Sequence, residues 1–218
     1  MNSTMLQPSR PAATAFLLAL AVLLLAAPAM ASSATGEAFG VSVKVIGVSL
    51  ARTPDATVDA TRGVSTGQAP SVSVLNVLST GTLEVSAAGV GAENAATAET
   101  RATVQSVNIL GGVVKADLVV AMASSASNGR VAASYSDGST FVNLVVNGRS
   151  IIGPVAPNTK ISIPGVANVI LNEQSPSGNG TSTSGITVNA IHVQVLSLLG
   201  VTTGDVFVAS ASSSAIFP

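Results

Sequence analysis

Short runs in which apolar and polar residues alternate recur from residue 38 to residue 212, and this periodicity constrains the fold more than any other feature. Val41, Val43 and Val45, for example, share one side of the first run, as expected of a strand with one buried face. Valine, isoleucine and threonine dominate the runs, and turn residues separate them. Because no clear repeat of fixed length is present, the pattern predicts about ten strands in a single-domain antiparallel β-sandwich.

Turn residues predict three hairpins within this pattern. Asn147-Gly148 is a favoured type I′ turn. The predicted hairpins are residues 102–123 around Gly111-Gly112, residues 141–152 around Asn147-Gly148, and residues 159–174 around Pro164-Gly165, the last with a five-residue loop. We expect residues 38–50 to form the first strand and the polar, proline-containing residues 52–70 to form a long surface loop.

The N-terminal residues have the features of a signal peptide. Arg10 precedes the uninterrupted apolar run at residues 15–27, and Ala29-Met30-Ala31 is a small-x-small cleavage pattern. The run is shorter than the ~20 residues of a membrane span, although a retained anchor is the competing interpretation. We expect cleavage after Ala31, export of residues 32–218 as one domain, and a secreted or cell-surface location with no transmembrane span in the exported part.

Composition excludes several classes of function. Charged residues make up 9% of the chain, against about 25% in ordinary domains, and no basic patch is present, so we expect no nucleic-acid partner. Without cysteine and with one histidine, the chain cannot build thiolate or multi-histidine zinc sites. Aromatic residues make up 3%, which disfavours a sugar-stacking platform, although Tyr135 and Phe141 remain candidates for one.

One group of polar residues is a candidate site: Asn172, Glu173, Gln174, Asn189 and His192. The alternation places Glu173 on the same side of its strand as Val169 and Leu171. In residues 186–196 the apolar side changes near Ala190, which a bulge would explain.

Glu173 could orient His192 for a serine nucleophile. However, the chain has no G-x-S-x-G motif. The alternative is that these side chains bond to the backbone and to one another at the rim of the sandwich. We therefore assign no catalytic residue.

We assign no metal and no cofactor. Asp55, Asp59 and Asp137 lie in predicted loops, but no D-x-D-x-D-G pattern accompanies them. The glycines at 89 and 91 lack the Lys-Ser/Thr of a phosphate-binding loop.

Several blocks occur in an order that resembles a known family. They are GEAFGVSVKVIGVSL, LSTGTLEVSAAG, VNILGGVVKADLVVAMASSAS, VVNGRSI, APNTKISIPGVANVILNEQ, ITVNAIHVQVL and GDVFVASASSS. Together they resemble the choice-of-anchor P family of exported bacterial proteins, from about Gly36 to about Ser213. The resemblance implies an exported domain that is followed, in its relatives, by a surface-attachment signal. This chain stops about where such a signal would begin, and the resemblance implies no catalytic residue.

The predicted function is that of a secreted or cell-surface structural or interaction protein, with other cell-surface or extracellular components as partners. One alternative is a module that binds a glycan or small ligand near Tyr135 or Phe141. The other is a hydrolase that uses Glu173 and His192.

Overall fold

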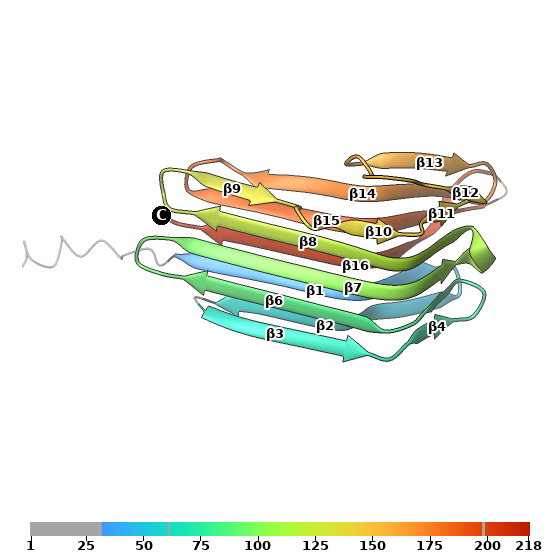
Figure 1. Cartoon of the computed structure of the whole chain (residues 1–218), viewed down its shortest axis with the longest axis horizontal. Helices are drawn as coiled ribbons and strands as arrows, with labels where there is room; N and C mark the ends of the chain where they lie inside the picture. Colours follow the sequence, from blue (N-terminus) through green and yellow to red (C-terminus); the bar gives the residue numbers. More distant parts are fainter. Residues whose placement is uncertain (1–31, 61, 198) are drawn as a thin grey trace, which may run out of the picture. The chain divides into compact units, whose positions relative to one another are not determined.

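The computed structural model describes residues 32–218 apart from 61 and 198, and strands account for most of them (Figure 1). The predicted signal peptide, residues 1–31, lies outside the described residues. The strands are β1 (Ser33–Val45), β2 (Val48–Ala60), β3 (Arg62–Ala69), β4 (Val72–Val74), β5 (Leu78–Thr80), β6 (Leu83–Gly91), β7 (Ala96–Ile109), β8 (Val114–Ser127), β9 (Ala132–Tyr135), β10 (Thr140–Val142), β11 (Val145–Val146), β12 (Arg149–Ser150), β13 (Thr159–Ile163), β14 (Ala167–Gly178), β15 (Thr183–Leu196) and β16 (Thr202–Ile216). A 3₁₀ turn, η1 (Leu110–Gly112), joins β7 to β8.

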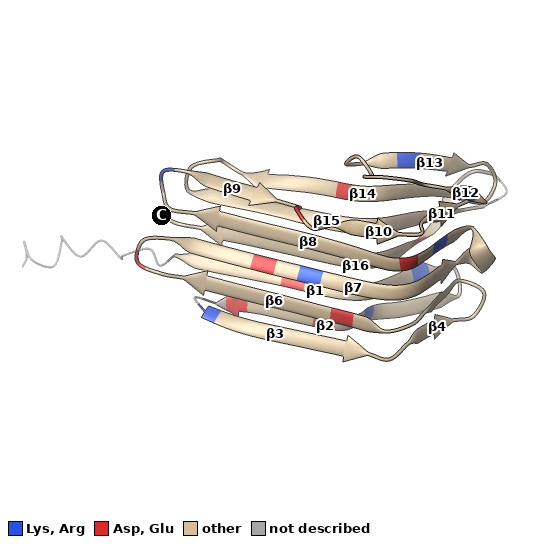
Figure 2. Ribbon diagram, viewed as in Figure 1, with Lys and Arg blue, Asp and Glu red and all other residues tan. Residues whose placement is uncertain are grey.

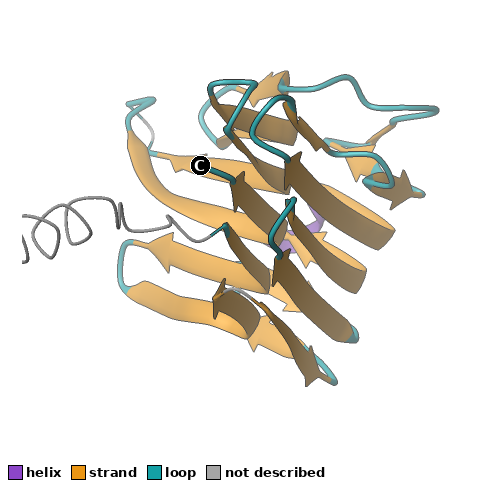
Figure 3. Ribbon diagram, turned by 90° about the vertical axis from the view of Figure 1, so that its left-hand side faces the viewer, coloured by secondary structure: helices purple, strands orange, loops and turns teal. Residues whose placement is uncertain are grey.

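The strands form two antiparallel sheets that pack face to face, as predicted (Figures 1 and 3). One sheet has six strands in the order β13-β14-β15-β16-β1-β2. The other has ten strands, six of which follow the spatial order β12-β11-β8-β7-β5-β4. Of the remaining four, β6 pairs with both β7 and β3, and β9 and β10 each pair with β8. The described residues therefore hold more strands than the ten predicted, because the second sheet ends in short pieces whose length carries little periodic signal.

The prediction of a surface loop at residues 52–70 was wrong. These residues lie mostly in β2 and β3, and the predicted first strand instead spans β1, the turn at Ile46-Gly47 and the start of β2. Both strands lie at sheet edges, where one side faces water and polar residues fit. Pro54 is compatible with an edge strand because it has no N–H to donate to a ladder.

The predicted hairpins are present. Val146 pairs with Arg149 across Asn147-Gly148, and β7 pairs with β8 across η1. In the hairpin of β13 and β14, Ile163 pairs with Ala167, so the loop has three residues rather than the predicted five.

The buried side changes at the same level in four neighbouring strands of the six-stranded sheet. Gly40, Asn172, Ala190 and Ala209 interrupt the ladders at this level, and we call these four residues the switch row. Asn172 and Ala209 have φ values of 51° and 54°, in the left-handed region. The residue after such a position points to the other side of the sheet, so consecutive inward residues are three positions apart, as are Val208 and Ala211 around Ala209. The same spacing separates Val188 and Ile191 around Ala190. The predicted change near Ala190 is confirmed.

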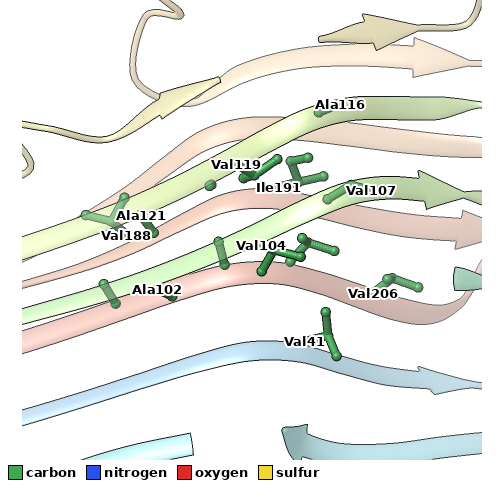
Figure 4. Packing of buried hydrophobic residues seen from close by; sticks show 14 of the residues in the cluster. Val41, Ala102, Val104, Val107, Ala116, Val119, Ala121, Val188, Ile191 and Val206 are labelled. Atoms are coloured by element: carbon green, nitrogen blue, oxygen red, sulfur yellow. The ribbon is translucent and has the colours of Figure 1, made fainter. Parts of the chain in front are cut away.

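The space between the sheets is filled mainly by valine and alanine side chains (Figure 4). Val41, Val104, Val119, Ile191 and Val206 are each 0% exposed. Gly40 belongs to this core because a Cβ there would lie 2.7 Å from Cδ2 of Leu83 in the opposite sheet. Close packing of small side chains keeps the two sheets together along their length.

The switch row predicts that glycine substitutions at two alanines of β16 differ in their effect on stability. Ala209 has a left-handed backbone and Ala211 does not, and both are fully buried. Because an L-side chain strains the left-handed conformation, Ala209→Gly should cost less stability than Ala211→Gly by about 1 kcal/mol. Urea unfolding of the two variants measures this difference. Equal losses would show that the left-handed conformation places no strain on the Ala209 side chain.

Candidate functional site

His192 lies on the outer side of the six-stranded sheet, near its middle. It follows Ala190 of the switch row on β15, and its neighbours Ile191 and Val193 point into the core. Strand β14 brings Glu173 to one side of the imidazole, and β16 brings Asp205 to the other. His192 is buried, with 7% of the residue exposed, although it is on the outer face of the sandwich.

Both ring nitrogens of His192 contact a carboxylate. Nδ1 lies 3.3 Å and 3.2 Å from the two oxygens of Glu173, and Nε2 lies 2.8 Å from Oδ1 of Asp205. A neutral imidazole has one N–H and can donate to only one of them, whereas a protonated ring donates to both. The carboxylates are themselves partly exposed, with side-chain accessibilities of 24% and 39%. They can therefore keep contact with water while they hold the ring.

The ring of Phe207 covers the imidazole. Phe207 is opposite His192 in the ladder of β15 and β16, and the two ring centroids lie 4.1 Å apart with an interplanar angle of 19°. Such stacking contributes attraction beyond burial alone. It also explains why a histidine on a polar face is shielded from water.

Asn189 and Ser210 extend the network. Nδ2 of Asn189 donates to Oε2 of Glu173 at 2.8 Å, and the Ser210 hydroxyl donates to Oδ1 of Asn189 at 2.7 Å. A continuous path of contacts thus runs from Ser210 through Asn189, Glu173 and His192 to Asp205. We call these five residues, together with Phe207, the histidine network.

The structure separates the five predicted polar residues into two groups. Glu173, Asn189 and His192 belong to the histidine network. Asn172 instead donates to the carbonyl of Val155 at 2.9 Å and accepts from Gln174 at 2.9 Å, so these two side chains fasten the segment before β13 to β14.

The prediction that Glu173 shares a side of its strand with Val169 and Leu171 was wrong. The left-handed Asn172 turns Glu173 away from Val169 and Leu171 to the outer face. Asp205, Phe207 and Ser210 were not predicted, because their position beside His192 depends on the pairing of β15 with β16. The alternation of residues 205–208 does show that Asp205 and Phe207 share a side of their strand.

The geometry provides the orienting acid of a catalytic triad, but it places no nucleophile against the histidine. Glu173 does contact His192, as an orienting acid would. However, the second ring nitrogen contacts Asp205, and Ser210 donates to Asn189 rather than to the ring. Among the described residues no serine or threonine hydroxyl is hydrogen-bonded to His192. The arrangement therefore positions a histidine between acids and provides no nucleophile.

The remaining acidic candidates do not converge. In the part of the chain that the structure describes, no three His, Cys, Asp or Glu side chains form a group that could hold a metal ion. Asp55 and Asp59 lie on β2, in a strand rather than the predicted loop, and Asp137 follows β9 in a turn.

The two aromatic candidates for ligand binding differ in exposure. Phe141 packs against the core. Tyr135 is 55% exposed and borders a hollow of ≈ 300 Å³ on the outer face of the ten-stranded sheet. That hollow is lined by Ala88, Val90, Thr97, Glu99 and Ser124 among others.

A second hollow adjoins the histidine network. It has a volume of ≈ 280 Å³ and is lined in part by Asn189, Phe207 and Ser210. Arg52 also lines this hollow, and it pairs with Glu37 and lies 4.8 Å from the ring centre of Phe39.

Comparisons with known proteins found no matching family model, curated protein or solved structure. Among the described residues, no helix is both long and apolar enough to cross a membrane.

The histidine network predicts a stability effect. His192→Ala removes contacts to two carboxylates and the stack on Phe207, and we expect it to lower the free energy of unfolding by about 2 kcal/mol. The control is Gln194→Ala, also on β15, which should change stability by less than about 0.5 kcal/mol. A double-mutant cycle with Glu173→Gln should give a coupling energy of about 1 kcal/mol. Zero coupling would mean that the Glu173–His192 contact contributes nothing.

Proposed function

We propose that the chain is an exported bacterial protein, secreted or held at the cell surface, that acts as a structural or interaction module and not as an enzyme. This proposal rests on the contacts of His192, because both of its ring nitrogens contact carboxylates of the chain itself. A general base needs one ring nitrogen free to face a reacting group. The histidine network is better suited to joining three strands than to turnover.

Export is supported by the N-terminal sequence. The basic residue, the apolar run at residues 15–27 and Ala29-Met30-Ala31 follow one another in the order that signal peptidase substrates require. The absence of cysteine means that such a domain must depend on its core rather than on disulfides. The ordered sequence blocks support membership of the choice-of-anchor P family as part of the same proposal.

Export can be tested by N-terminal sequencing of the protein recovered from the medium and from the cell surface. We expect the exported protein to begin at Ser32. The double substitution Ala29→Gln and Ala31→Gln should block processing and leave a longer product with the cell membrane. As a control, Ser33→Gln should be processed normally. An unprocessed wild-type chain in every fraction would contradict the proposal.

A ligand-binding module is the second candidate, and the exposed ring of Tyr135 beside a hollow favours it. A sugar or other small ligand could stack on such a ring while Glu99 and Thr97 bond its hydroxyl groups. If this is the function, a glycan array should give a signal that Tyr135→Ala abolishes and Phe141→Leu preserves. Because Phe141 packs against the core, the second substitution controls for effects on folding. An array without signal would remove this candidate.

A further inference from the structure

Three neighbouring hairpins of the six-stranded sheet expose large aliphatic side chains at one end of the sandwich. Ile46 lies in the turn of β1 and β2, Val166 in that of β13 and β14, and Leu199 and Val201 in that of β15 and β16. Their exposures are 80%, 37%, 91% and 62%. We call these four residues the aliphatic end.

The turns lie side by side. The N–H of Leu196 donates to the carbonyl of Val166 at 2.9 Å, which joins the β13–β14 turn to the end of β15. On the other side, Val45 pairs with Gly204, so the β1–β2 turn adjoins the start of β16. Figure 1 shows all three turns at the end away from the C-terminus. The exposed side chains thus belong to one surface and are not scattered singly.

The turns project freely into solvent. Each contains a glycine with positive φ, namely Gly47, Gly165 and Gly200, and a Cβ built on any of the three would meet no atom within 4 Å. Turns of this kind ordinarily carry polar residues, so aliphatic side chains there add nothing to the core. Neighbouring exposed apolar residues with polar surroundings are typical of a binding surface.

Basic residues lie close behind the aliphatic end. Lys44 is two residues before Ile46, and Lys160 is on β13, and both are exposed. Lys115 and Arg149 lie near the η1 and Asn147-Gly148 turns of the other sheet, which Figure 1 shows at the same end. Figure 2 shows basic segments of β1, β8 and β13 in this half of the sandwich.

Acidic residues at this end have partners within the chain. Asp205 contacts His192, and Asp117 accepts a hydrogen bond from Asn143. None of the residues in the three turns is acidic. The hydrogen bond from the neutral Asn143 amide leaves Asp117 charged, and Asp205 is opposite Lys44 in the ladder of β1 and β16. Lys44, Lys115, Arg149 and Lys160 still outnumber these two acidic residues, so the net charge near the aliphatic end is positive.

We propose that the aliphatic end docks on an anionic lipid surface, with its four side chains among the lipid headgroups and Lys44 and Lys160 at the phosphates. Apolar insertion and attraction to anionic lipid reinforce each other in such binding. A second copy of the chain fits less well, because a symmetric contact through this end would place lysines of both copies close together. The surface gives an exported domain a means of attachment that needs no membrane-spanning segment.

Vesicle co-sedimentation of the exported protein, residues 32–218, tests this proposal. Phosphatidylcholine vesicles with and without phosphatidylserine provide neutral and anionic surfaces. We expect binding to the anionic vesicles that weakens with added salt. The double substitution Ile46→Ser and Leu199→Ser should lower the partition coefficient about a hundredfold. Lys44→Gln with Lys160→Gln should lower it about tenfold or more and reduce the salt dependence.

The matched control is Val131→Ser, which replaces an exposed valine in the β8–β9 turn at the opposite end. It should bind like the wild type. Thermal unfolding checks that each variant folds, and Val201→Ser alone provides a milder change at the aliphatic end.

Three results would overturn the proposal. They are equal binding to both kinds of vesicle, equal losses for the Ile46/Leu199 and Val131 variants, and no binding at all. If binding is absent and size-exclusion chromatography shows a dimer that the Ile46/Leu199 variant dissolves, a second copy covers this end instead.

Discussion

The left-handed residues of the switch row are the constraint on which the candidate site depends. Without Asn172 and the interruption at Ala190, strict alternation would put Glu173 and His192 on opposite sides of the sheet from each other, with one of them in the core. An unpaired charge in the core is strongly unfavourable. The change of side at one level in four strands keeps an apolar core on both halves of the sheet. It also brings Glu173, His192 and Phe207 together on the outer face.

The histidine network shows how this weakly charged chain uses its few ionisable groups. His192 joins β14, β15 and β16 through side chains, in addition to the backbone ladders. A buried N–H without an acceptor would destabilise the fold, whereas here a carboxylate lies beside each ring nitrogen to accept from it. Because the carboxylates reach water, they avoid the full desolvation cost of a buried ion pair. A network of this kind fixes strand register without needing a ligand.

The sequence was sufficient to predict the parts of the fold that are local. Alternation and turn residues identified the antiparallel sandwich and the hairpins at Gly111-Gly112 and Asn147-Gly148. The prediction for Glu173 failed because a left-handed asparagine leaves no trace in an apolar–polar pattern, although asparagine tolerates that conformation better than most residues. Asp205 was missed because its place beside His192 follows from strand order. Residues 52–70 were misread because edge strands resemble polar loops in composition.

Elsewhere on the described surface, hydrogen bonds within the chain hold several polar side chains in place. Asn179 is an example, because its side-chain oxygen accepts from the N–H groups of Thr181, Ser182 and Thr183, and its amide donates to Ser182. Such contacts order a turn that has little apolar support. The aliphatic end differs because its exposed groups are apolar, so hydrogen bonds within the chain cannot satisfy them. Its apolar surface stays in contact with water unless something outside the fold covers it.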